Sequence, residues 1–288
     1  MLAIYKKELK SYLSSMMGCV FIAFCLAITS LYFCLYNLYY AYPNIYMALQ
    51  GVVWFFIILM PILTMRIISE EQRNKTDQLL YTAPVSVSSI VMGKYLAMLT
   101  IFAIPVLIVC TYPLILSQYG EVQYVASYLA ILAYFLIGAT FIAVGMFISS
   151  ITESQIIAAV VSFAVLLVSH LMSTLVELIS GTAEASLIGF IILIIVLCAI
   201  YYLLAKNLLV SIISFLVLTA ITVILYFVKP VIFEGAINSA LESFCITTMA
   251  EDLFIYSILD ITAIVYYVTI IAFFIFITVQ SIQKKRWN

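Results

Sequence analysis

The sequence predicts an all-α protein, a polytopic bundle of about eight membrane-spanning helices. Three observations carry this prediction. Hydrophobic residues make up 67% of the chain and charged residues only 9%, whereas about a quarter of a typical soluble domain is charged. Apolar runs long enough to cross about 30 Å of hydrocarbon recur along the chain. The charged residues gather in the segments between these runs. We therefore expect a single transmembrane domain over 1–288.

The first thirteen residues predict an amphipathic helix. Apolar side chains recur every three or four positions, at Leu2, Tyr5, Leu9 and Leu13. The lysines, Lys6, Lys7 and Lys10, fall elsewhere around the helix. We expect this helix to lie on the cytoplasmic membrane surface, with its lysines near anionic headgroups. The alternative is an extension of the first span.

Eight apolar stretches follow, and each is long enough to span. They run over 16–38, 47–68, 95–117, 125–150, 156–178, 187–205, 208–228 and 259–282. The boundary between the sixth and seventh depends on Lys206 and Asn207, which interrupt a long apolar run. Because a lysine at mid-membrane is costly, this pair is expected at a surface. Residues 187–228 would then form a hairpin.

The basic residues predict the orientation. With eight spans, eleven of the twelve basic residues fall on one side, and only Lys229 falls on the other. Basic loops face the cytoplasm, so both termini are predicted to be cytoplasmic. Residues 229–258 then form the largest outer connection. Its side chains Phe233, Ile237, Leu241 and Phe244 make one stripe of an amphipathic helix.

Few polar side chains lie within the predicted spans. His170 and Glu177 are seven residues apart on one face of the fifth span, and ionisable residues in spans are functional candidates. We consider them for a translocation path, with a structural hydrogen bond as the alternative. They are also the only pair from which a membrane-embedded enzyme could be built. The sequence has no GxxxxGK or HExxH motif, and we expect no metal site.

A polar segment, Ser69–Lys94, interrupts the apolar pattern between the second and third spans. Glu70 with Arg73 and Glu71 with Lys75 have the spacing of helical ion pairs. Leu79, Leu80 and Tyr81 would form an apolar knob before Pro84 ends the helix. We interpret the polar segment as a rigid elbow that binds a soluble partner. A solvated loop with incidental ion pairs is the alternative.

The polar segment resembles one family of membrane proteins, the ABC-2 type permeases, in the branch of gliding-motility and nitrous-oxide-reductase-maturation transporters. The resemblance rests on an EE...GT.E.LL.T.P.S....GK pattern, here Glu70-Glu71, Arg73, Thr76, Gln78-Leu79-Leu80, Thr82, Pro84-Val85-Ser86 and Gly93-Lys94. Two further stretches resemble the family: 149–155, and the chain end from Asp260 to Trp287. Asn74-Lys75-Thr76-Asp77 replaces the glycine-threonine-acidic step of the pattern.

The resemblance implies a permease subunit of an ATP-driven exporter in the bacterial cytoplasmic membrane. Such permeases have six spans, so 187–228 would be an additional hairpin. The expected partners are two ATPase subunits, which would bind ATP and Mg²⁺, a second permease chain as homodimer or heterodimer, and the lipid bilayer. No cofactor on this chain and no nucleic-acid partner are expected.

The resemblance also assigns ATPase-coupling positions to two connections between spans. They are Glu70, Glu71, Arg73, Thr76, Gln78, Leu79, Leu80 and Pro84 in the polar segment, and Thr152, Glu153 and Gln155 after the fourth span. A different function would use the same surface. A membrane scaffold without transport activity could anchor soluble proteins through the polar segment.

Overall fold

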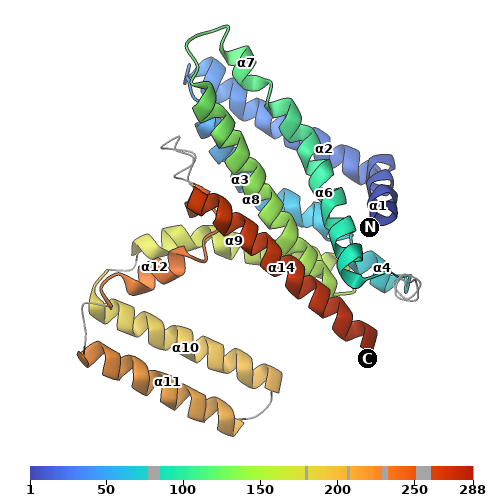
Figure 1. Cartoon of the computed structure of the whole chain (residues 1–288). Coiled ribbons are helices and arrows are strands. Elements are labelled where there is room, and N and C mark those ends of the chain that lie inside the picture. The colour runs from blue at the N-terminus through green and yellow to red at the C-terminus, as the bar shows by residue number, and fades with distance from the viewer. Residues whose placement is uncertain (77–84, 179–180, 206–207, 229–232, 251–260, 288) are drawn as a thin grey trace. The chain divides into compact units, whose positions relative to one another are not determined.

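Helices make up all the regular secondary structure in the residues that the computed structural model describes, which are 1–76, 85–178, 181–205, 208–228, 233–250 and 261–287 (Figure 1). The elements are α1 (Leu2–Ser14), α2 (Met16–Phe33), the π-helix η1 (Cys34–Tyr39), α3 (Tyr46–Thr64), α4 (Ser69–Arg73), α6 (Val87–Val109), α7 (Tyr112–Leu116), α8 (Tyr124–Ile151), α9 (Gln155–Leu178), α10 (Ala183–Ala205), α11 (Leu208–Val228), α12 (Ala236–Glu242), the 3-10 helix η3 (Thr248–Ala250) and α14 (Ile261–Trp287).

The described helices include six that are long and apolar enough to cross a membrane. They are Met16–Tyr39, Tyr46–Arg73, Val87–Leu116, Tyr124–Ile151, Gln155–Met172 and Ile261–Lys285. Two shorter apolar helices, Ala183–Ile195 and Ile212–Tyr226, lie where the hairpin was predicted. The all-helical, multi-pass architecture is thus confirmed, and the count of eight spans stays a prediction.

The chain divides into two compact units. Unit 1 comprises Met1–Val168 with Met249–Asn288, and unit 2 comprises Ser169–Thr248. In unit 1, α8 packs against α3, α6 and α14. Of its apolar membrane-spanning stretch, 83% is buried inside the protein. Of the corresponding apolar stretch of α14, only 17% is buried. Helix α8 is therefore the centre of unit 1, and α14 lies at its edge.

Close approach between α3 and α8 depends on a glycine. A Cβ atom at Gly145 of α8 would clash with the side chain of Thr64 on α3. Small residues at the contact between two membrane helices let their backbones approach closely. Aromatic rings pack where α3, α6 and α8 meet, with Tyr134 of α8 against Phe56 of α3 and Phe102 of α6 at centroid distances of 4.6 and 5.9 Å.

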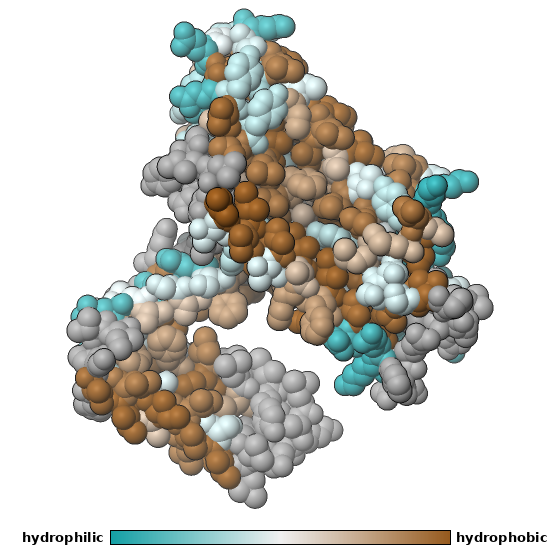
Figure 2. Space-filling view, viewed as in Figure 1, coloured by the Kyte–Doolittle hydropathy of each residue, from teal (hydrophilic) through white to brown (hydrophobic). Residues whose placement is uncertain are grey.

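The surface of unit 1 matches a membrane protein. Figure 2 shows apolar residues over the middle of its helices and hydrophilic residues gathered toward its ends. Figure 1 shows that α1, α4 and the end of α14 lie at the same end of unit 1. Both chain ends and the root of the polar segment thus lie together. Their cytoplasmic placement stays a prediction.

Unit 2 contains a helical hairpin. Helices α10 and α11 lie side by side, α12 packs on α10, and the Phe233 ring contacts Phe190 and Tyr226 edge-on. The predicted outer stripe has its first two members, Phe233 and Ile237, buried, whereas Phe244 is 66% exposed. Residues 229–232 and 251–260, which include the rest of the outer connection, lie outside the described residues.

Candidate functional site

The candidate site is the root of the polar segment, at one end of unit 1. Helix α4 is only five residues long and ends at Arg73. The third span begins earlier than the predicted residue 95, because Ser86 caps α6 by accepting a hydrogen bond from the Ser89 N–H at 3.4 Å. Lys94 therefore lies within α6. Its side chain is only 2% exposed.

Lys94 joins three elements through its ammonium group. Its Nζ donates to the Ile67 carbonyl oxygen at 2.8 Å, lies 2.9 Å from Glu71 Oε2 and donates to Glu8 Oε1 at 3.2 Å. A lysine has three N–H donors, so each has a partner. Removing one member of a buried ion pair typically costs about 3–5 kcal/mol, because the other charge stays buried without compensation. Loss of either carboxylate is therefore expected to destabilise the arrangement.

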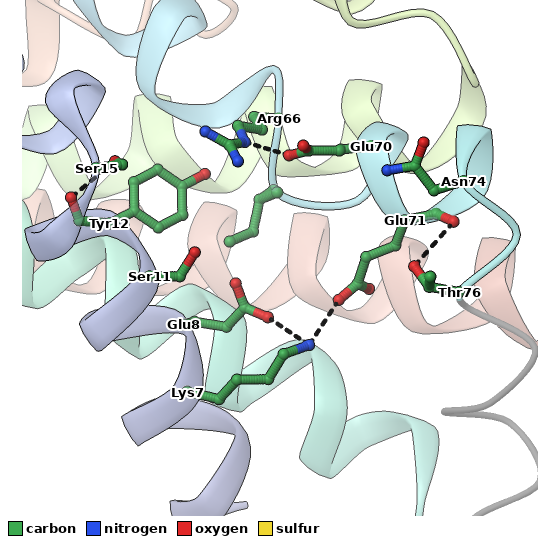
Figure 3. A pocket seen from close by; sticks show the side chains of 11 residues that line it. Lys7, Glu8, Ser11, Tyr12, Ser15, Arg66, Glu70, Glu71, Asn74 and Thr76 are labelled. Carbon is green, nitrogen blue, oxygen red and sulfur yellow. Dashed lines mark hydrogen bonds and ion pairs between the residues drawn. The ribbon is translucent and has the colours of Figure 1, made fainter.

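A second lysine closes this group at the surface. Lys7 Nζ lies 3.4 Å from Glu71 Oε1 and 3.7 Å from Glu8 Oε1, and its side chain is 61% exposed. Figure 3 shows Lys7 between the two carboxylates. We call Lys7, Glu8, Glu71 and Lys94 the Lys94 cluster. Its two acids and two bases balance, which lowers the cost of burying charge.

The ion pairs predicted within the polar segment do not form among the described residues. Glu70 pairs with Arg66, one turn earlier, and Glu71 pairs with Lys94 and Lys7. The reason is that α4 stops at Arg73, so Lys75 is not a helical neighbour of Glu71. The partners predicted from helical spacing are therefore wrong. Most of the observed partners of these two carboxylates come from other helices.

The end of α4 is a left-handed turn. Lys75 has a φ of 55°, its N–H bonds to the Gln72 carbonyl at 3.1 Å, and the Thr76 N–H bonds to the Glu71 carbonyl at 3.0 Å. This pair of bonds defines a Schellman motif, whose left-handed position usually holds glycine. The resembled pattern has glycine at this position. The substitution by lysine therefore preserves the turn at a conformational cost.

A second set of hydrogen bonds ties α4 to α8 and α14. Gln72 Nε2 donates to the Ser150 carbonyl at 3.1 Å, and Lys285 Nζ donates to Gln72 Oε1 and to the Ser150 carbonyl, each at 2.9 Å. Ser149 Oγ accepts from the Ser69 N–H at 3.2 Å and donates to the Met65 carbonyl at 3.2 Å. The start of the polar segment is thus bound to α8 and α14 as well as to α1 and α6.

A cavity of about 260 Å³ lies between α1 and α4. Its walls include Glu8, Glu70, Glu71 and Arg66, together with Tyr12 (Figure 3). Burial raises the pKa of Tyr12, and the Glu8 carboxylate raises it further. The phenol is therefore neutral, and it donates to the Leu63 carbonyl at 3.2 Å. Most residues that line the cavity are polar, and its charged side chains are already ion-paired.

The structure gathers part of the predicted coupling set. Glu70, Glu71, Arg73 and Thr76 lie in or just after α4, and Gln72 links that helix to Ser150, shortly before Thr152, Glu153 and Gln155. Arg73, Thr76 and Glu153 are exposed. Gln78, Leu79, Leu80 and Pro84 lie outside the described residues.

The predicted path residues belong to a different unit. His170 is in unit 2, where its Nδ1 lies 3.2 Å from Thr247 Oγ1. Glu177 lies in α9, and its side chain is not described. No group of three metal-ligating side chains occurs among the described residues. The hydrogen bond of His170 gives it a structural partner, and its predicted transport role stays untested.

Three residues that hold the site together, Glu8, Tyr12 and Lys285, were not predicted from the sequence, and Lys94, Ser149 and Ser150 were named only within the resembled motifs. One signal was available. Glu8 is the only acidic residue in the first helix and lies one turn from Tyr12. Both are buried against the protein, whereas Leu2 is 72% and Leu13 is 41% exposed.

Comparison with known proteins identifies a family. Residues 5–209 of the 288 match the family model described as ABC-2 family transporter protein. The matched range includes α4, α6, most of α1 and all four members of the Lys94 cluster. Neither curated proteins nor solved structures gave a match.

Proposed function

Because the chain belongs to the ABC-2 transporter family and is a multi-pass membrane permease component of an ABC transporter, we propose that it couples ATP hydrolysis on separate ATPase subunits to export. The proposed assembly has two ATPase subunits, which hold ATP and Mg²⁺, and two permease chains in a bacterial cytoplasmic membrane. This chain binds no cofactor in the proposal. The gliding-motility branch is proposed on the motifs of the polar segment.

The observation that carries the proposal is the anchoring of α4. Its acidic residue Glu71 is bound to α6 and α1, and Gln72 is bound to α8 and α14. Most short surface helices can move independently of the bundle, because few buried contacts hold them. Here a displacement of α4 acts directly on four helices. Such an anchored surface helix fits the transmission of force from a soluble partner.

The exposed side chains beyond these anchors supply the proposed docking surface. Arg73 and Thr76 are exposed, as is Glu153 in the following connection. The sequence adds Leu79 and Leu80 as an apolar contact. Docking at Arg73 and Glu153 leaves the internal pairs of Glu71 and Gln72 intact, so that binding and anchoring use different residues.

The composition of the spans favours an amphipathic cargo. The six apolar spans have mean hydropathies of 2.2 to 2.4, and ionisable groups within spans are the usual mark of paths for small ions. We therefore propose a lipid-like or peptide cargo, exported along a path between two permease chains.

Co-purification with the ATPase tests this function. Reversing two exposed charges, Arg73→Glu with Glu153→Lys, is expected to reduce ATPase binding at least tenfold without lowering the thermal midpoint of the permease. The matched control is Glu121→Lys, an exposed position on a predicted outer loop. Binding that is equal in both variants would refute the docking surface.

ATPase measurements separate transport from the scaffold alternative. A transporter reconstituted in liposomes with its ATPase should hydrolyse ATP faster when cargo is present. A scaffold would bind the ATPase without any response to candidate lipids or peptides.

A further inference from the structure

Helix α1 is held along one face by contacts with α6. At the position of a Gly93 Cβ, the Met1 carbonyl oxygen would lie 3.2 Å away and Ile4 Cγ2 3.3 Å away. Tyr5 Oη and Thr100 Oγ1 lie 3.0 Å apart. Glycine at 93 therefore lets α1 approach α6 closely, and Lys94 follows directly in the sequence.

The central contact of that face is ionic and is shared with the polar segment. Glu8 of α1 and Glu71 of α4 are bound to the same ammonium group, at 3.2 and 2.9 Å. Without Lys94, the cation that remains paired with both carboxylates is Lys7, whose side chain is 61% exposed. Exposed ion pairs contribute little because water screens them. Lys94 thus supplies the buried ionic link between α1 and α4.

We propose that Lys94 is a positioning residue for energy coupling, which makes α1 and the root of the polar segment move as one element. The proposal rests on the proposed function and adds to it a movement of α1 together with α4. An ATPase that displaces α4 would also displace α1, through Glu71, Lys94 and Glu8. The basic face of α1 would then move relative to the membrane surface in each transport cycle.

Hydrogen exchange of the purified chain tests the mechanical link without any ATPase. In Lys94→Met, the backbone amides of α1 are expected to exchange at least tenfold faster than in the wild type. In Glu8→Gln, which keeps Lys94 paired with Glu71, the expected increase is about threefold. The control is Lys10→Met, an exposed position on the same helix, which should leave exchange unchanged.

The choice of variants keeps the result decisive. If Lys94→Met does not fold, as judged by size exclusion and thermal unfolding, Glu8→Gln provides the test. Unchanged α1 exchange in the folded variants would overturn the proposal. Faster exchange that is equal in Lys10→Met would overturn it as well, because the effect would then not depend on the ionic link.

Transport measurements distinguish coupling from stability. In Glu8→Gln, ATPase binding and ATP hydrolysis are expected to remain, while cargo transported per ATP falls severalfold. An unchanged ratio would refute the coupling role even if α1 is loosened. If no ATPase binds any form of the chain, the proposed function fails, and the exchange experiment still reports on the α1–α4 link.

Discussion

Lys94 Nζ and Glu71 Oε2 lie 2.9 Å apart, so the base of the third span is bound to the short helix that begins the polar segment. The same ammonium group binds Glu8, which is 86 residues away in the sequence. The two glutamates of α4 therefore have different roles. Glu71 links α4 to α1 and α6 through Lys7 and Lys94, whereas Glu70 makes one local pair with Arg66.

This difference predicts unequal effects of two neighbouring substitutions. Glu71→Gln should destabilise the protein by about 2 kcal/mol, because a buried ammonium loses one of its charged partners. Glu70→Gln should cost less than about 1 kcal/mol, because its pair with Arg66 is partly solvated. Thermal unfolding in detergent compares them directly. Equal losses would contradict the assignment of Glu71 to the Lys94 cluster.

The left-handed turn after α4 predicts a stabilising substitution. Lys75→Gly should raise stability by up to about 1 kcal/mol, because glycine adopts a positive φ without steric cost. Arg73→Gly, in the helical part of α4, should instead lower stability by about 0.5–1 kcal/mol. The thermal midpoints of the two variants should therefore shift in opposite directions. A lower midpoint for Lys75→Gly would contradict the turn described here.

The anchor between α4 and α14 predicts an effect at the end of the chain. Lys285→Met removes the donor to Gln72 and to the Ser150 carbonyl, and should cost about 1–3 kcal/mol. Lys284→Met changes a neighbouring exposed lysine and should be near neutral. The midpoint of thermal unfolding provides the measurement. Similar values for both variants would show that the Lys285 contacts do not stabilise the fold.

The contact between α3 and α8 predicts a strong size dependence at one glycine. Gly145→Leu would force Thr64 and its helix away from α8, at a cost of about 1–3 kcal/mol or more. Gly120→Leu is a suitable control, because nothing lies within 4 Å of a Cβ atom there. Folded yield and thermal unfolding should both fall only for Gly145→Leu. Tolerance of leucine at 145 would argue against this helix contact.

Hydrophobic pattern predicted most of the architecture because lipid exposure constrains long stretches of sequence. The first helix, the hairpin and the long apolar helices lie close to their expected positions. Apolar composition places the start of the third span at residue 95, eight residues after α6 begins, because Lys94 is charged although α1 and α4 cover it. Local composition cannot show that such residues are covered by another part of the chain.

The candidate site was predictable only in part, for the same reason. Spacing identifies contacts within one helix, and it suggested partners for Glu70 and Glu71 within the polar segment. The observed partners of Glu71 come from α1 and α6. Lys285 reaches Gln72 from the opposite end of the chain. Only the tertiary fold brings these residues together, so no pattern within one segment reveals them.

The central claim, that an ATPase docks on the exposed surface next to α4, is tested most directly by site-specific photocrosslinking. A photoreactive amino acid would be placed at Arg73, at Glu153 or, as the control, at Glu121, all of which are exposed. We predict crosslinks to the ATPase from 73 and 153 and none from 121. Efficient ATPase binding without a crosslink from 73 or 153, or with one only from 121, would contradict the account.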